Sequence, residues 1–130
     1  MNTNPTVTAY LNDVGLELDA VERLTAPPLN RFASFHLQQA AEKLVKAIRL
    51  HREKYASSEH RISILLDDLP PGDPWIARLT PLNDLSQFAT SYRYATDAGR
   101  VKVGLDEPAI KARVAQIRAL LAEARAECGG

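Results

Sequence analysis

The stretch FHLQQAAEKLVKAIRL, residues 35–50, carries apolar side chains that recur at steps of three and four, the spacing of an α-helix. We expect this helix to start with Asn30 as its cap and to run to about Lys54. One face is apolar and rich in alanine, which lets a neighbouring helix approach closely; it comprises Ala33, Leu37, Ala40, Ala41, Leu44, Ala47 and Ile48. The opposite face is predicted to be a solvated surface of Gln38, Glu42, Lys46 and Arg49.

Helical periodicity continues on both sides of this stretch. Before it, a helix starting at Asn4-Pro5 and ending at TAPPLN, 25–30, has the stripe Val7, Leu11, Val14, Leu18 and Val21. After it, Ser57 or Ser58 can cap a short helix with Ile62, Leu65, Leu66 and Leu69 facing inward, which PPGDP, 70–74, ends. The region 74–94 is predicted to be one kinked helix or two short ones. Its stripe is Leu82, Leu85, Phe88, Ala89 and Tyr92.

The last helix is expected to start at Asp106 and Pro108, with the stripe Ile110, Val114, Ile117 and Leu121. No segment sustains the alternation of a strand. The sequence therefore predicts an all-α fold, an up-and-down antiparallel helical bundle of four long helical segments plus one short helix. At 130 residues it fits a single domain, 1–130.

Composition excludes several classes of function. Sixteen basic and sixteen acidic residues give no net charge, which argues against DNA or an anionic membrane bound by bulk attraction. No apolar run approaches the roughly 18–20 residues that span a bilayer, and the start lacks a signal-peptide pattern. Together these features favour a cytoplasmic protein. Glycine-rich phosphate loops and histidine or cysteine spacings for metals are missing too, so we expect neither a cofactor nor a metal site.

Two groups of residues are candidates for a binding site. His36, Gln39 and Lys43 share one edge of the second helix, as a packing or subunit surface or as the wall of a binding cleft. In TSYRYATD, 90–97, Arg93 and Tyr94 stand where a helix gives way to a loop. An arginine can hold a phosphate bidentately and a tyrosine can stack on a base. The alternative is a surface arginine beside a tyrosine packed at a helix end.

Three stretches resemble the HEPN domain family (higher eukaryotes and prokaryotes nucleotide-binding). The first matches the family's signature helix at Phe35, His36, Gln38, Gln39, Glu42, Lys43, Lys46 and Ala47. EHRISILLDDL, 59–69, is similar to the family's His-Asp-Leu helix, with His60 in place and Arg61 where aspartate is usual. YRYATD resembles an Arg-Tyr-Pro-Asp stretch, with Ala95 in place of proline.

This resemblance implies a small antiparallel bundle that is usually a homodimer. It also implies a minimal nucleotidyltransferase as partner, often in a toxin–antitoxin pair. Active relatives are metal-independent ribonucleases that use an arginine followed, four to six residues later, by a histidine. Here no histidine follows Arg93. That departure removes the usual agent of acid–base cleavage near neutral pH.

We therefore expect a non-catalytic module that binds a nucleotide, RNA or a nucleotidyltransferase. Its expected residues are Arg93, Tyr94, His60 and Arg61, with His36, Gln39 and Lys43 as an extension. One alternative is a ribonuclease toxin that uses Arg93 with a displaced His60 or Asp97, and another is a dimeric scaffold without a ligand. We expect a dimer because three apolar side chains lie outside the main stripe of the second helix: Phe32, Phe35 and Leu50.

Antiparallel order also makes a prediction about the placement of these groups. The start of the third helix and the end of the fourth should lie together, which brings Arg93 near free backbone N–H groups at Arg61. The same order puts the start of the second helix, with His36, at the other end of the bundle. In a dimer, the second subunit could supply its own His36 at this end.

Overall fold

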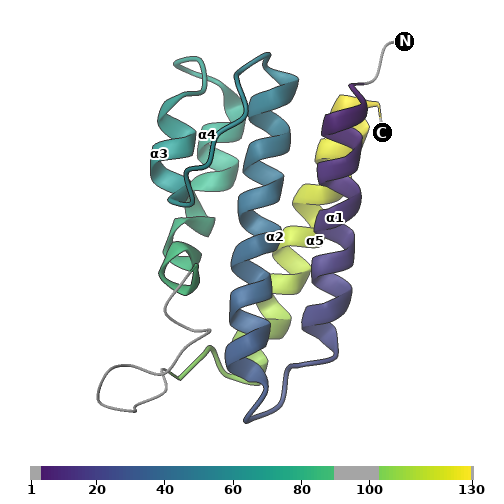
Figure 1. Ribbon diagram of the computed structural model, residues 1–130, viewed down its shortest axis with the longest axis vertical. Coiled ribbons are helices and arrows are strands. Elements are labelled where there is room, and N and C mark those ends of the chain that lie inside the picture. The colour runs from purple at the N-terminus through teal and green to yellow at the C-terminus, as the bar shows by residue number, and fades with distance from the viewer. Residues whose placement is uncertain (1–3, 90–102, 130) are drawn as a thin grey trace.

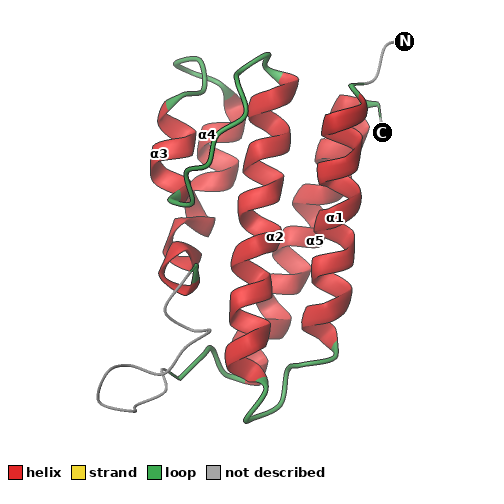
Figure 2. Cartoon of the chain, in the orientation of Figure 1, coloured by secondary structure: helices red, strands yellow, loops and turns green. Residues whose placement is uncertain are grey.

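Six helical elements make up the part of the chain that the computed structural model describes, residues 4–89 and 103–129 (Figure 2). In chain order they are α1 (Pro5–Glu22), α2 (Asn30–His51), α3 (Ile62–Asp67), α4 (Pro74–Leu79), the 3-10 helix η1 (Thr80–Phe88) and α5 (Glu107–Cys128). No strand occurs within these ranges, and the predicted all-α class is confirmed. Three elements are long and three are short, because the chain from Pro74 forms two short helices instead of a fourth long one.

Helix α2 is the central element of the bundle. Figure 1 shows α1 antiparallel to α2 on one side, with α5 beside both and parallel to α2. On the other side of α2 stand α3, α4 and η1. Because neighbours cover α2 from both sides, this helix is buried around most of its circumference.

Strict up-and-down alternation fails at α3. The connection 52–61 runs back along α2 before α3 begins, so α3 rises in the same direction as α2 (Figure 1). Two contacts fix this direction: His60, before α3, bonds Glu42 in the middle of α2, and Asp68, after α3, bonds Arg49 near its end. Ten extended residues span up to about 33 Å, which is enough for the return.

Local start signals for three helices are confirmed. Asn4 accepts hydrogen bonds from the N–H groups of Thr6 and Val7, and a proline follows it at the first helical position. Asp73 caps α4 and Asp106 caps α5 in the same way, each with a proline in the first turn. A side-chain acceptor and a proline need only local sequence to act, which is why they were predictable.

Two other predicted caps are wrong. Helix α2 begins at Asn30 itself, with Leu29 as the cap residue, and the Asn30 amide donates to the Leu105 carbonyl at 2.9 Å instead. Ser57 does not cap α3 but accepts from the Glu59 N–H. Helix α3 begins only at Ile62, after an extended Arg61. The first error arises from the long-range contact between Asn30 and Leu105, which a local pattern does not contain.

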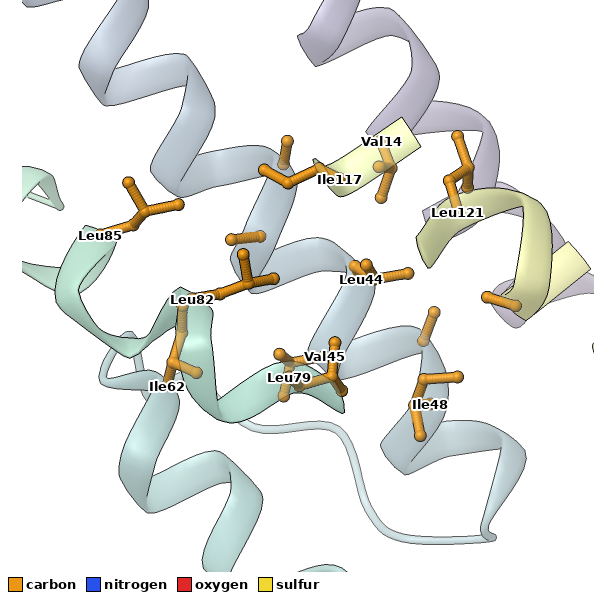
Figure 3. Close-up of a cluster of buried hydrophobic side chains, with 14 of the residues drawn as sticks. Val14, Leu44, Val45, Ile48, Ile62, Leu79, Leu82, Leu85, Ile117 and Leu121 are labelled. Carbon is orange, nitrogen blue, oxygen red and sulfur yellow. The ribbon is translucent and has the colours of Figure 1, made fainter. Parts of the chain in front are cut away.

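One apolar core joins the two sides of α2. In Figure 3, Leu44, Val45 and Ile48 of α2 lie between Val14, Ile117 and Leu121 on one side and Ile62, Leu79, Leu82 and Leu85 on the other. The predicted stripes of α1 and α5 are buried, as expected. Leu50 also packs against this core, whereas Phe32 and Phe35 are half-buried at the start of α2.

Candidate functional site

The face of α2 predicted to be solvated is buried. The side chains of Gln38, Glu42, Lys46 and Arg49 belong to residues only 0%, 5%, 8% and 3% exposed. The reason is the course of the connection 52–61, which returns along α2 and covers this face, together with α3. The sequence did carry a signal: three of these polar residues are in the stretch that resembles the HEPN signature helix, and they offer complementary donors and acceptors one helical turn apart.

A carboxylate lies at the centre of this buried face. Glu42 Oε1 accepts from Gln38 Nε2 at 2.7 Å, and Glu42 Oε2 accepts from Lys46 Nζ at 2.8 Å. His60 Nδ1 lies 3.0 and 3.2 Å from the two carboxylate oxygens. Gln39 Nε2 donates to Gln38 Oε1 at 2.7 Å and extends the chain of bonds outward. Gln38, Gln39, Glu42, Lys46 and His60 together form the Glu42 network.

His60 is the part of the Glu42 network that faces solvent. Its side chain is 59% exposed, while that of Glu42 is 6% exposed. The buried carboxylate accepts the Nδ1 proton, which fixes the ring orientation and directs Nε2 away from Glu42. In the neutral ring Nε2 is an acceptor, and in the protonated ring it is a donor suited to a phosphate oxygen. A carboxylate behind an exposed imidazole therefore supports either anion binding or proton transfer.

Arg61 extends the exposed surface next to His60 but already has a partner. Its guanidinium donates through Nε and Nη2 to the two oxygens of Glu59, at 3.0 and 2.9 Å. The same carboxylate accepts the N–H groups of His60 and Arg61. The side-chain bond from Arg61 contributes most to lowering the pKa of Glu59, to about 2. Glu59 thus holds the place that a ligand oxyanion would take on these donors.

The expectation of free N–H groups at the start of α3 is wrong for its first two residues. The Ile62 N–H donates to Ser86 Oγ at 3.1 Å, and the Ser63 N–H donates to Asn83 Oδ1 at 2.9 Å. These bonds confirm that the start of the third helix lies beside the fourth segment of the chain. An anion near Arg61 would therefore not find the Ile62 and Ser63 N–H groups free.

His36 and Lys43 are not brought together with His60. Both bond Glu17 on α1: His36 Nδ1 at 2.7 Å from Oε1, and Lys43 Nζ at 3.0 Å from Oε2. Burial acts to lower the pKa of Lys43, but Glu17, with a smaller effect from Asp13, raises it overall. These two residues fasten α2 to α1, which favours the packing interpretation of this edge. Of the predicted edge, only Gln39 belongs to the Glu42 network.

Three predicted residues, Arg93, Tyr94 and Asp97, lie outside the described residues. Within the described ranges, no cluster of three or more histidine, cysteine, aspartate or glutamate side chains could hold a metal ion. Nor does any helix there combine the length and apolar character needed to cross a membrane.

Two cavities open on the surface of the described part of the chain, and no predicted site residue lines either of them. A cavity of about 340 Å³ between α1 and α5 is lined by Glu22, Thr25, Lys111 and Val114. A smaller one of about 190 Å³ lies between α3 and the α4–η1 side and includes Ser63 and Asn83 in its lining.

The fold and the site define a small helical bundle whose central helix carries a buried polar network that ends in an exposed histidine. The chain belongs to the HEPN domain family, whose model matches residues 16–124. That match includes all of α2 and the whole Glu42 network. The family supports a nucleotide- or RNA-related module.

A solved structure has the same fold. The crystal structure of TT1696 from Thermus thermophilus matches with a TM-score of 0.70 and 22% sequence identity, over 92% of this chain and 95% of that chain. At this identity the likeness shows the fold alone. Among curated proteins no relative matches this chain.

Proposed function

We propose that the chain is a nucleotide- or RNA-binding module without nuclease activity, and that it holds a phosphate through His60 and Arg61. The observation that carries this proposal is the His60 imidazole, exposed to solvent and fixed in orientation by a buried carboxylate. An anchored ring loses little conformational freedom when it binds a ligand. Arg61 offers a forked donor set next to it, already shaped to hold an oxyanion by its contact with Glu59.

Arg93 and Tyr94 remain part of the proposed site on sequence grounds. Arg93 follows the last residue of η1, Phe88, by five positions. Ser86 of η1 accepts the N–H group of Ile62 at the start of α3, so the end of η1 lies close to Arg61. Five residues span at most about 18 Å, which limits how far Arg93 can lie from Phe88.

Calorimetric titration at low salt, with mononucleotides and short RNA, tests this proposal. His60→Ala and Arg93→Ala should each weaken binding at least about tenfold, since a charge-assisted bond to a ligand contributes about 1.5–3 kcal/mol. Glu59→Gln should strengthen binding, because it weakens the internal competitor for the Arg61 donors. His51→Ala is the matched control, since the His51 ring also faces a glutamate, but this one is Glu127 of α5, outside the Glu42 network. Unchanged affinity in both His60→Ala and Arg93→Ala would place the site elsewhere.

A ribonuclease is the second candidate, and the same histidine favours it. A carboxylate that orients an imidazole is the arrangement by which enzymes hold a general base in the productive tautomer. Incubation of RNA with the purified protein in a metal chelator separates the two functions. The binding module predicts no cleavage above background. Cleavage that His60→Ala and Arg93→Ala both abolish would establish the ribonuclease instead.

A homodimer and a nucleotidyltransferase partner are further parts of the proposal, supported by family membership. An adjacent reading frame that encodes a small nucleotidyltransferase would identify the candidate partner, and co-expression would test the complex. Toxicity on expression that the neighbouring product relieves would support a toxin–antitoxin pair.

A further inference from the structure

We propose that Tyr55 is a stacking platform for an unpaired nucleobase, so that the connection 52–61 binds single-stranded RNA along its length. This inference rests on the proposed function and names its ligand class more closely. Tyr55 is 91% exposed, more than any other large hydrophobic residue in the described part of the chain. A ring in that position makes no contribution to the core.

The backbone that carries Tyr55 is fixed, although it belongs to no regular element. Helix α2 ends in a Schellman motif, in which the Glu53 N–H bonds the Leu50 carbonyl and the Lys54 N–H bonds the Arg49 carbonyl at 2.9 Å each. Glu53 takes the left-handed position of this motif, with φ 62°, where glycine is usual. A side chain there is strained, and such strain is kept only where the surroundings hold it.

A buried arginine holds the other side of Tyr55. Arg49 donates through Nη1 to the Tyr55 carbonyl at 3.0 Å and through Nη2 to Asp68 after α3. Arg49 is only 3% exposed, so its guanidinium clamps the connection to the two helices that it joins. The ring of Tyr55 is therefore presented to solvent from a rigid base. A rigid aromatic surface binds with a lower entropic cost than one on a mobile loop.

Charge around the ring fits a nucleic-acid strand. Lys54 precedes Tyr55, and within the described ranges no carboxylate forms an ion pair with its ammonium group. His60 and Arg61 follow at the other end of the same connection. Glu53, which is exposed, and Glu59, which pairs with Arg61, reduce the positive charge, and the whole chain has none in excess. Bulk attraction is therefore weak, and base stacking has to contribute a large share of the affinity.

Stacking on an exposed ring selects single strands. A base within a duplex has both faces covered by its neighbours, whereas an unpaired base can place one face on an aromatic side chain. Tyr55 and His60 are five positions apart in the chain, a span of at most about 18 Å. A short strand can therefore place one base on Tyr55 and a phosphate at His60.

Fluorescence anisotropy with two labelled probes tests the proposal. The first probe is a hexamer of adenylate, and the second is an abasic hexamer with the same phosphates. Tyr55→Ala should weaken binding of the adenylate probe roughly tenfold, within the range for loss of one stacked base, and leave the abasic probe unchanged. Tyr55→Phe keeps the ring and should stay within about twofold of the wild type. Leu16→Ala, which removes an exposed apolar side chain from α1, is the control.

The outcomes separate this inference from the proposed function. If Tyr55→Ala binds the adenylate probe as the wild type does while His60→Ala weakens both probes, stacking is overturned and the phosphate site stands. An equal loss for both probes in Tyr55→Ala also overturns stacking. If neither probe binds the wild type at low salt, both the inference and the proposed function are overturned. Binding of an adenylate–uridylate duplex as tight as that of the single strand would overturn the selectivity.

Discussion

Removing the Glu42 carboxylate is the perturbation whose effect follows most directly from the structure. The Glu42 and Lys46 side chains are 6% and 10% exposed, and their ion pair is 2.8 Å long. Glu42→Ala leaves the Lys46 ammonium buried without a counter-charge and the Gln38 amide without its acceptor. Breaking a buried pair by removing one partner costs about 3–5 kcal/mol. For a chain of this length, the total stability is roughly 6–20 kcal/mol, so this loss is large.

Urea denaturation followed by circular dichroism measures the effect. We expect the midpoint for Glu42→Ala to fall sharply while the slope stays constant. Asp13→Ala is the matched control, because it removes a carboxylate that also faces a lysine but is 53% exposed; it should cost no more than about 1 kcal/mol. The double variant Glu42→Leu, Lys46→Met should lose less than the sum of the single losses, since no charge stays buried. A loss under about 1 kcal/mol in Glu42→Ala would refute the buried network.

Three further predictions address the ends of the helices and the assembly. The bond from Arg52 contributes most to lowering the pKa of Asp73 in the folded protein. The Asp73 carboxylate therefore stabilises the fold at any pH above its unfolded pKa, near 3.8, and this stabilisation is lost as the pH falls through the lower folded pKa. The stability gap between wild type and Asp73→Asn, followed by thermal melts, should therefore be constant near neutrality and close below about pH 4; a gap that persists in acid would contradict it. Glu53→Gly should raise the unfolding free energy by about 1 kcal/mol, because glycine takes φ 62° without strain, and a loss of stability would show that the Glu53 side chain is needed. Light scattering at micromolar concentration should give the mass of a homodimer, and a mass of 14.3 kDa would show a monomer.

Local patterns were enough to predict much of the scaffold. The stripe from Val7 to Val21 and the caps at Asn4, Asp73 and Asp106 depend on neighbours within a few residues, and each is as expected. The side of α2 that carries Glu42 was predicted wrongly. Its burial depends on the return of the connection 52–61, which is a long-range event without a local signature.

The candidate site was predictable in part. Resemblance to the HEPN signature pointed to α2 and to His60 as candidates, but it did not predict the contact between His60 and Glu42, since the two residues are eighteen positions apart. The grouping of His36 and Lys43 with the ligand site followed from their position on one helix edge. In the structure both side chains contact the Glu17 carboxylate on α1 instead. Periodicity within α2 does not predict which acidic residue of a neighbouring helix His36 and Lys43 will contact.

Histidine-ring NMR during a titration with a short adenylate strand tests whether His60 lies at the ligand site. The chain has three histidines, and each occupies a different setting, so each resonance reports on its own location. We expect the proton between His60 and Glu42 to lie on Nδ1, and the His60 signals to shift to saturation with added strand. His36, bound to Glu17 on the α1 side, should stay unchanged. A titration that shifts His36 and leaves His60 in place, or one that shifts no histidine, would contradict this expectation.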